Sequence, residues 1–207
     1  MFKLLVPIPK EIFIAVSGGI DSMVVLDFCM MMKKQITVLT FDHGTEFGKI
    51  STEFVTDFCD KKGISLIQGK IQSNIDWLHK SKEEIWRFCR YEFFKQNSNP
   101  NNKIITAHHL NDAIETWIFT SLHGNPFLIP PKRDNFIRPF LTSEKELFVQ
   151  WAKNKKVPYL NDPSNNDSRY MRNLIRNEIV PNALRVNPGL PKVIRKKYLE
   201  LIQNENS

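Results

Sequence analysis

The sequence predicts an α/β protein in which a parallel sheet carries helices on both of its faces. Short apolar runs alternate along the first 122 residues with longer segments that have helical spacing. Parallel sheets produce this alternation because each helix returns the chain to the start of the next strand. In addition, polar motifs directly follow three of the apolar runs, at the strand ends where parallel sheets bind their ligands.

Three strands and two helices are expected in the first part of the chain. The strands are predicted at residues 12–16, 36–41 and 64–67, each of which is a mainly apolar run. A glycine loop separates the first strand from an apolar helix over residues 23–30. Residues 50–62 have helical spacing and end before Gly63, a residue type that commonly terminates helices.

A further helix, strand and helix complete the alternation. The first helix is expected at residues 81–95, where Ser81 and Glu84 have the spacing of a capping box. After a polar turn, residues 103–107 form the predicted fourth strand, and residues 111–122 form the helix that follows it.

The remaining chain is predicted to be less regular. Residues 124–138 are rich in turn-forming residues and carry no predicted strand. A helix over residues 143–155 is followed by an extended, proline-containing stretch, and a basic helix begins near Arg172. We therefore expect an α/β domain over residues 1–140 and a short helical extension over residues 141–207 that packs on it.

Composition limits the class of protein. Hydrophobic residues make up 42% of the 207 residues, enough for a core, and no stretch approaches the about 18 apolar residues of a membrane span. Three widely spaced cysteines favour neither a disulfide framework nor a cysteine metal site, so we expect a cytoplasmic protein without membrane association. The net charge of +7 suits a polyanion such as RNA, although basic soluble proteins of other kinds share it. The oligomeric state stays open, with a homodimer as one option.

The first polar motif is a loop over residues 17–22, which reads Ser-Gly-Gly-Ile-Asp-Ser between a strand and a helix. Backbone N–H groups at a helix N-terminus bind phosphate, and glycines allow the ligand to approach closely. The hydroxyls are further donors, and Asp21 is placed to hold a metal ion bound to the phosphates. The loop lacks the lysine of a P-loop and resembles that of PP-loop ATP pyrophosphatases, which cleave ATP between its α- and β-phosphates. The alternative is a plain serine–glycine turn.

The second motif follows the fourth predicted strand and combines two histidines with two carboxylates. His108 and His109 precede the predicted helix, and Asp112 and Glu115 are three residues apart and so share one helical face. This set suits a metal ion, an ammonium group or proton transfer. Helix capping by Asn111 or Asp112, with Glu115 near the positive end of the helix dipole, is the alternative and leaves the histidines unexplained.

Two basic segments suit contacts with phosphate. Arg87 and Arg90 are one helical turn apart on the helix over residues 81–95, although pairing with glutamates of that helix or simple solvation also explains them. Residues 161–176 are dense in turn formers and then basic, and Tyr170 is suited to stack on an unpaired base. An Asx turn that caps the last helix explains the same segment.

Four segments, at residues 17–22, 87–91, 107–116 and 162–176, together resemble the tRNA(Ile)-lysidine synthase family. The resemblance extends over about residues 12–189, and its last segment, which begins with Asp-Pro-Ser-Asn, is the most specific. It implies an adenine nucleotide alpha hydrolase-like fold and a ligase that uses ATP to adenylate the wobble cytidine of a tRNA(Ile) with a CAU anticodon. Free L-lysine then displaces AMP and gives lysidine. The implied cofactors are ATP and Mg²⁺.

The resemblance also implies roles for individual residues. ATP would be bound by Ser17, Gly18, Gly19, Ile20, Asp21 and Ser22, with Asp21 next to the metal ion. The implied catalytic residues are Asp21, Arg90, His108, Asp112 and Glu115. Among these, Arg90 would neutralise the leaving pyrophosphate, and the two acids Asp112 and Glu115 would hold the ammonium group of lysine. Contacts with tRNA are implied for Arg87, Arg169, Tyr170, Arg172, Asn173 and Arg176.

The chain departs from the family pattern beside these two acids. Asn111 and Ala113 stand where the family usually has aspartate and glutamine, so one carboxylate and one amide are missing. After the second predicted strand, the chain also lacks an arginine that the family usually has. Two other functions stay open: a PP-loop enzyme that thiolates tRNA or uses a different amine, and a non-catalytic tRNA-binding relative.

Overall fold

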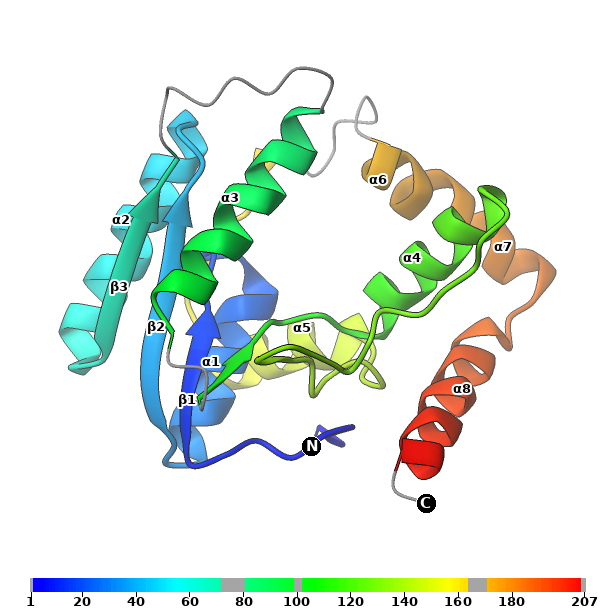
Figure 1. Cartoon of the computed structure of the whole chain (residues 1–207), viewed down its shortest axis with the longest axis horizontal. Coiled ribbons are helices and arrows are strands. Elements are labelled where there is room, and N and C mark those ends of the chain that lie inside the picture. Colours follow the sequence, from blue (N-terminus) through cyan, green and yellow to red (C-terminus); the bar gives the residue numbers. More distant parts are fainter. Residues whose placement is uncertain (1, 72–80, 99–101, 164–170, 206–207) are drawn as a thin grey trace.

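The computed structural model describes residues 2–71, 81–98, 102–163 and 171–205, and a six-stranded sheet lies at its centre (Figure 1). The strands are β1 (Glu11–Ala15), β2 (Gln35–Asp42), β3 (Ser65–Lys70), β4 (Lys103–Ile105), β5 (Lys132–Arg133) and β6 (Phe136–Ile137). Their order is β3-β2-β1-β4-β6-β5, and every neighbouring pair is parallel except β5 and β6. The predicted α/β class with a mostly parallel sheet is thereby confirmed.

The hairpin of β5 and β6 lies within residues 124–138, where the sequence pattern indicated turns and a strand was not expected. Both residues of β6 pair with Ile104 and Ile105 of β4, so the hairpin extends the sheet at this edge. Asp134 turns the chain between the two strands with a φ of 55°, a left-handed conformation that Asp tolerates. Strands of two residues are too short to show an alternating pattern, and the pairing with β4 stabilises them instead.

The helices are α1 (Ile20–Met31), α2 (Glu46–Lys62), α3 (Lys82–Gln96), α4 (Leu110–Leu122), α5 (Lys145–Lys155), α6 (Met171–Leu174), α7 (Val180–Val186) and α8 (Leu190–Glu205). Helices α3, α4 and α5 begin within two residues of their predicted starts, whereas α1 and α2 begin three and four residues earlier than predicted. The Thr45 side chain accepts a hydrogen bond from Gly48 N and so caps α2. The basic helix predicted near Arg172 is interrupted, because a π-helical turn over Ile175–Ile179 joins α6 to α7 and a turn precedes α8.

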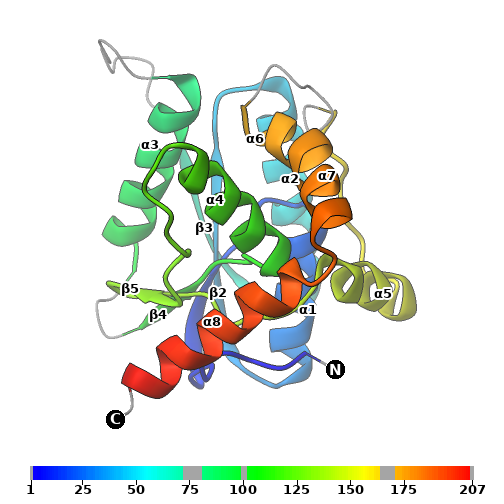
Figure 2. The same cartoon turned by 90° about the vertical axis from the view of Figure 1, so that its right-hand side faces the viewer.

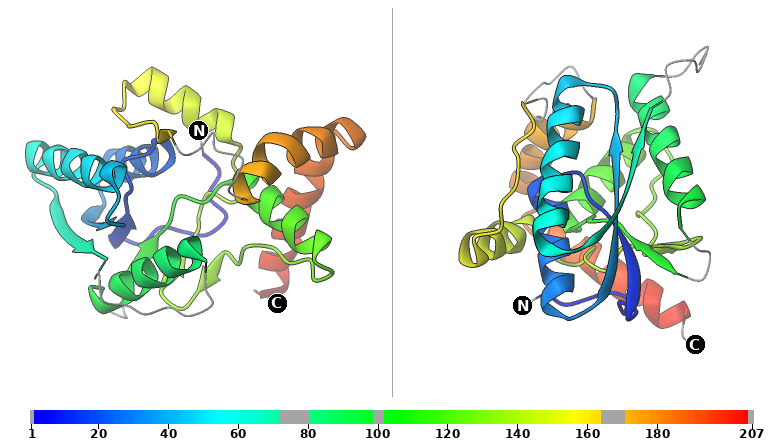
Figure 3. Two further views of the ribbon diagram at one scale, coloured as in Figure 1. Left: turned by 90° about the horizontal axis from the view of Figure 1, so that it is seen from above. Right: turned by 90° about the vertical axis from the view of Figure 1, so that its left-hand side faces the viewer.

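Helices cover both faces of the sheet (Figures 2 and 3). Ile12 and Ile14 of β1 pack with apolar side chains of α1 and α2 on one face. Phe13, which lies between them in β1, packs with Phe94 of α3 on the opposite face. Successive side chains of a strand point to opposite faces, so a strand with helices on both sides is apolar throughout.

Helices α4, α7 and α8 form a second apolar group next to the sheet. Leu110 and Ile114 of α4 are buried in the same cluster as Ile194 and Tyr198 of α8. Tyr198 Oη also donates a hydrogen bond to Ile129 O at 2.9 Å, which ties α8 to the segment before β5. Across the described ranges, no helix is both long and apolar enough to cross a membrane.

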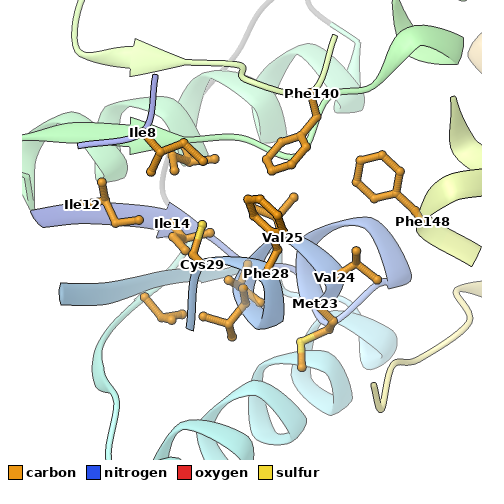
Figure 4. Close-up of a cluster of buried hydrophobic side chains, with 14 of the residues drawn as sticks. Ile8, Ile12, Ile14, Met23, Val24, Val25, Phe28, Cys29, Phe140 and Phe148 are labelled. Carbon is orange, nitrogen blue, oxygen red and sulfur yellow. The ribbon is translucent and has the colours of Figure 1, made fainter. Parts of the chain in front are cut away.

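A cluster of phenylalanine rings joins α5 to α1 (Figure 4). The ring centroid of Phe140 lies 5.6 Å from that of Phe28 in α1 and 5.8 Å from that of Phe148 in α5. Phe2 adds a fourth ring, with its centroid 5.2 Å from that of Phe140. Close-packed rings leave little room for movement, so the cluster sets where α5 starts relative to α1.

We expect Phe140→Ala to lower the free energy of unfolding by about 3–5 kcal/mol, because the substitution leaves a cavity between α1 and α5. Urea unfolding followed by circular dichroism measures the loss. Leu122→Ala, at a residue that is 65% exposed, is the control, and we expect it to change the value by less than about 0.5 kcal/mol. A loss below about 1 kcal/mol for Phe140→Ala would contradict tight packing at this cluster.

Candidate active site

Three polar motifs lie at one edge of the sheet. The loop over residues 17–22 follows β1, His43 follows β2, and His108 follows β4. These three strands are parallel, so their carboxyl ends lie at the same edge, toward which the arrowheads of the strands point in Figure 1. The carboxyl edge of a parallel sheet is where such folds bind ligands.

The loop that follows β1 leads directly into the N-terminus of α1. Gly18 has a φ of 76°, in the left-handed region that favours glycine, and its carbonyl accepts a hydrogen bond of 2.9 Å from Leu160 N. Ser22 Oγ accepts a hydrogen bond from Ser17 N and donates one to Gly19 O. Gly19 is the N-cap of α1 and provides no capping side chain, so the first N–H groups of α1 remain for another acceptor.

The carboxylate of Asp21, in the first turn of α1, faces two basic groups. Lys145 Nζ donates a hydrogen bond of 2.5 Å to Asp21 Oδ1, and His109 Nε2 lies 3.6 Å from the same oxygen. Burial alone would raise the pKa of Asp21, but His109 and Lys145 outweigh burial and lower the pKa below its usual value. Sequence reasoning missed Lys145, whose only signal there is a basic residue at the start of a predicted helix.

His109 connects the loop to α4. Asp112 N donates a hydrogen bond of 3.3 Å to His109 Nδ1, and His109 N donates one of 2.9 Å to Asp112 Oδ2, which together form a capping box. The N-cap of α4 is therefore His109, and the hypothesis of a cap at Asn111 or Asp112 is wrong in this detail. Burial would lower the pKa of His109, but Asp112 and Asp21 outweigh burial and raise it.

Two arginines of the C-terminal part lie against the acidic pair, Asp112 and Glu115. Arg176 Nε lies 2.7 Å from Glu115 Oε1, and Arg172 Nη2 lies 3.1 Å from Asp112 Oδ1. The side chains of Arg172 and Arg176 are 45% and 38% exposed, whereas both acids are buried. The sequence suggested a role in catalysis for the acids and in tRNA binding for the arginines, and the fold brings the two sets into contact.

These contacts favour the ionised form of Asp112. Burial would raise the pKa of Asp112, but His109, His108 and Arg172 lower it well below its usual value. Burial would lower the pKa of Arg176, and Glu115 outweighs that effect and raises it. Ionised carboxylates attract cations, so the acidic pair is electrostatically suited to an ammonium group.

The two predicted arginines of α3 reach different partners. Arg90 Nη1 lies 3.4 Å from His43 Nε2, and burial lowers the pKa of both side chains, that of His43 to about 4. Arg87 is exposed, and its guanidinium lies 4.9 Å from the centroid of the Tyr91 ring. Arg90 thus lies next to the histidine that follows β2, whereas Arg87 faces solvent.

A cavity of about 420 Å³ opens beside Glu115. The basic part of its lining consists of Arg87, Arg133, Arg138 and Arg172, and the apolar part includes Phe119, Phe127 and Ile129. His108 also lines it and contacts Thr106 Oγ1 through Nδ1 at 2.9 Å. Burial, reinforced by Arg138 against the opposing charge of Asp112, lowers the pKa of His108 to about 3, so its ring is neutral near pH 7.

The two departures from the family pattern beside the acidic pair have structural explanations. Asn111 Oδ1 accepts a hydrogen bond of 3.0 Å from Lys145 N and so anchors the start of α5. Ala113 is fully buried in the apolar group that α4 forms with α7 and α8. These positions therefore serve helix anchoring and packing.

Not all predicted site residues can be placed. Arg169 and Tyr170 lie outside the described residues, and Asn173 is buried in α6. In the part of the chain that is described, no group of three or more histidine, cysteine, aspartate or glutamate side chains is arranged to hold a metal ion.

Sequence comparisons show which protein family and which curated proteins the chain is similar to. The family model of the PP-loop domain matches residues 3–183. The tRNA(Ile)-lysidine synthase of Thermotoga sp. (strain RQ2) is 37% identical over 198 residues, which cover 89% of this chain and 48% of that protein. The tRNA(Ile)-lysidine synthase of Treponema denticola is 32% identical, covering 84% of this chain and 41% of that protein. The chain thus spans about half the length of the curated relatives it matches.

Solved structures share the fold. An NH3-dependent NAD synthetase from Campylobacter jejuni aligns with a TM-score of 0.54 over 96% of this chain and 87% of its own, at 16% identity. An NMN synthetase from Francisella tularensis aligns with a TM-score of 0.50 over 91% of this chain and 84% of its own, at 13% identity. At such low identity the likeness concerns the fold alone.

The neutral His108 predicts a specific dependence of stability on pH. Below about pH 6.5 the unfolded chain binds a proton at His108 and the folded chain does not, so stability falls as the pH drops toward about 3. We expect the free energy of unfolding of the wild type to fall by up to about 1.4 kcal/mol per pH unit more than that of His108→Gln. Urea unfolding of both proteins at pH 6.5, 5.5 and 4.5 measures the difference, and parallel pH profiles would contradict the assignment.

Proposed function

The chain belongs to the PP-loop domain family, and on that premise we propose that it is the ATP-binding and catalytic part of a tRNA(Ile)-lysidine synthase. The substrate is the wobble cytidine of a tRNA(Ile) with a CAU anticodon, and the amine is free L-lysine. The observation that carries the proposal is His109, which lies between Asp21 of the loop and Asp112 of the acidic pair. The reaction needs an ATP site and an amine site side by side, because ATP activates the atom that the amine attacks.

The proposed reaction has two steps. First, the cytidine O2 forms a bond to the α-phosphorus of ATP, and the bond from that phosphorus to the pyrophosphate oxygen breaks. Second, the ε-amine of lysine forms a bond to C2, the bond from C2 to the adenylated oxygen breaks, and AMP leaves. The amine gives up a proton, for which Glu115 is the assigned acceptor.

The loop after β1 fits the phosphates of ATP. A Cβ built on Gly19 would have Ser17 Oγ, at 3.6 Å, as its near neighbour, so a ligand has room to approach the backbone here. The first N–H groups of α1 and the helix dipole favour an anion at the same place. Asp21 is assigned to Mg²⁺, which, when bound with ATP, neutralises charge on the phosphates. Arg90 adds positive charge at this edge of the sheet.

The acidic pair is assigned to the ammonium group of lysine. In the structure, Arg172 and Arg176 form ion pairs with Asp112 and Glu115. An ammonium group is also a cation, so it can replace the arginines beside these carboxylates. The exchange would release two partly exposed arginines for contacts with tRNA phosphates. His108 carries no charge near pH 7, so it does not repel the ammonium group.

The cavity beside Glu115 is assigned to the rest of the lysine molecule. Phe119 and Ile129 offer apolar surface to the methylene groups. Arg133 and Arg138 offer positive charge to the α-carboxylate. An amine that lacks this carboxylate should therefore be a poor substrate.

The thiolation alternative has less support. Burial raises the pKa of Cys29 to about 12 and that of Cys59 to about 11, so neither thiol ionises near neutral pH. Cys89 is half-buried within α3. The alternative of a non-catalytic relative predicts instead that tRNA binds and that no pyrophosphate is released.

The proposed activity is tested by mixing the protein with ATP, Mg²⁺, radiolabelled lysine and tRNA(Ile) that has a CAU anticodon. We expect label in the RNA and release of pyrophosphate, and a loss of at least about a hundredfold in both for Asp21→Ala. Asp57→Ala, at an exposed acid of α2, is the charge-matched control and should keep full activity. Pyrophosphate release without label would point to another amine, and no release at all would exclude the enzyme.

The assigned lysine orientation is tested with cadaverine, which is lysine without its carboxylate. The wild type should use cadaverine about ten- to a hundredfold less efficiently than lysine, because one charge-assisted contact is lost. In Arg133→Met this preference should shrink, whereas Arg185→Met, at an exposed arginine of α7, should keep it. Equal use of the two amines by the wild type would contradict a carboxylate site in the cavity.

A further inference from the structure

The loop after β1 has no lysine of its own, but the fold brings one to it. Lys145 lies 124 positions after Asp21 and donates a hydrogen bond to its carboxylate. An ammonium group beside a phosphate-binding loop supplies the positive charge that P-loop proteins take from within the loop. The question is what Lys145 does when ATP occupies the loop.

Several contacts hold the backbone of Lys145 at this position. Asn111 Oδ1 accepts the hydrogen bond from Lys145 N, and Leu110 N donates one of 2.8 Å to Ser143 O. The neighbouring acid, Glu144, lies 2.6 Å from Arg195 of α8 and is engaged there. The start of α5 is thus fixed to α4 and α8, while the Lys145 side chain extends toward the loop and remains 31% exposed.

The binding of Mg²⁺ and ATP changes the charges that surround the Lys145 ammonium group. Without them, Lys145 balances the charge of Asp21, and His109 Nε2 lies near the same carboxylate oxygen. A divalent cation at Asp21 repels the ammonium group, and the phosphates beside it attract the same group. The lysine side chain is flexible and partly exposed, so it can turn from the carboxylate to a phosphate without a change in the backbone.

The position of His109 indicates which phosphates of ATP Lys145 would contact. His109 lies between Asp21 and Asp112, so Lys145 is on the loop side of this residue and the acidic pair is on the other. The α-phosphorus must face the cytidine and the amine, and therefore the acidic pair. The β- and γ-phosphates then extend away from it, toward Asp21 and Lys145.

We propose that Lys145 is a pyrophosphate-binding residue, which neutralises Asp21 in the free protein and moves to the β- and γ-phosphates when ATP and Mg²⁺ bind. The inference rests on the proposed function, because it takes the loop after β1 to be the ATP site. Lys145 then stays with the pyrophosphate as the bond to the α-phosphorus breaks and negative charge develops on the leaving group.

The test is isothermal titration of the protein with ATP, pyrophosphate and AMP, each in excess Mg²⁺. For Lys145→Ala we expect the affinity for ATP and for pyrophosphate to fall about ten- to a hundredfold, as for the loss of one charge-assisted contact. The affinity for AMP should change less than about twofold, because AMP lacks the phosphates that Lys145 contacts. Lys153→Ala, at an exposed lysine of the same helix, is the control and should leave all three affinities unchanged.

Two further variants separate this role from a structural one. Lys145→Gln keeps most of the side-chain length and loses the charge, so it should show the same loss of affinity as Lys145→Ala, and both variants should have a lower melting temperature because Asp21 loses its partner. Lys145→Arg keeps the charge and should recover most of the affinity for pyrophosphate.

The outcomes distinguish the inference from the function on which it rests. If the wild type binds ATP and Lys145→Ala and Lys145→Gln bind ATP and pyrophosphate equally well, the inference is wrong and the proposed function stands. An equal loss for AMP and pyrophosphate would also overturn it, because that result indicates a general electrostatic effect. If the wild type binds none of the three ligands, both the inference and the proposed function fail.

Discussion

The position of His109 between two carboxylates is the contact on which the rest of the site depends. Its Nε2 lies 3.6 Å from Asp21 at the start of α1, and its Nδ1 lies 3.2 Å from Asp112 at the start of α4. The two acids raise the pKa of the imidazole against the effect of burial. When it is protonated, the imidazole reduces the repulsion between the two carboxylates on either side of it, which favours the close approach of two helix N-termini with acidic first turns.

The other acidic side chains of the site are also paired with cations. Asp21 is paired with Lys145, and the acids of α4 are paired with Arg172 and Arg176. A buried carboxylate without a partner is costly, so these cations stabilise the protein in the absence of ligands. The cations come from partly exposed side chains. In the proposed function, these side chains give way to the cations that arrive with the substrates.

Aromatic packing fixes the position of Lys145 relative to Asp21. Phe140 lies between Phe28 of α1 and Phe148 of α5, and this contact places Lys145 opposite Asp21. Leu160, which follows α5, donates its backbone N–H to Gly18 of the loop. Residues on both sides of the predicted domain boundary after residue 140 thus shape the loop, and the boundary remains a prediction.

Local patterns in the sequence determined the α/β class, the loop at residues 17–22 and the starts of α3 and α4. These features depend on periodicity and on spacings of a few residues, which a sequence displays directly. The tertiary structure alone decided the two-residue strands β5 and β6, the contact of Lys145 with Asp21 and the pairing of Arg172 with the acids of α4. Each of these depends on contacts between segments far apart in the chain. Charged side chains at such distances choose partners by burial and geometry, which no local pattern records.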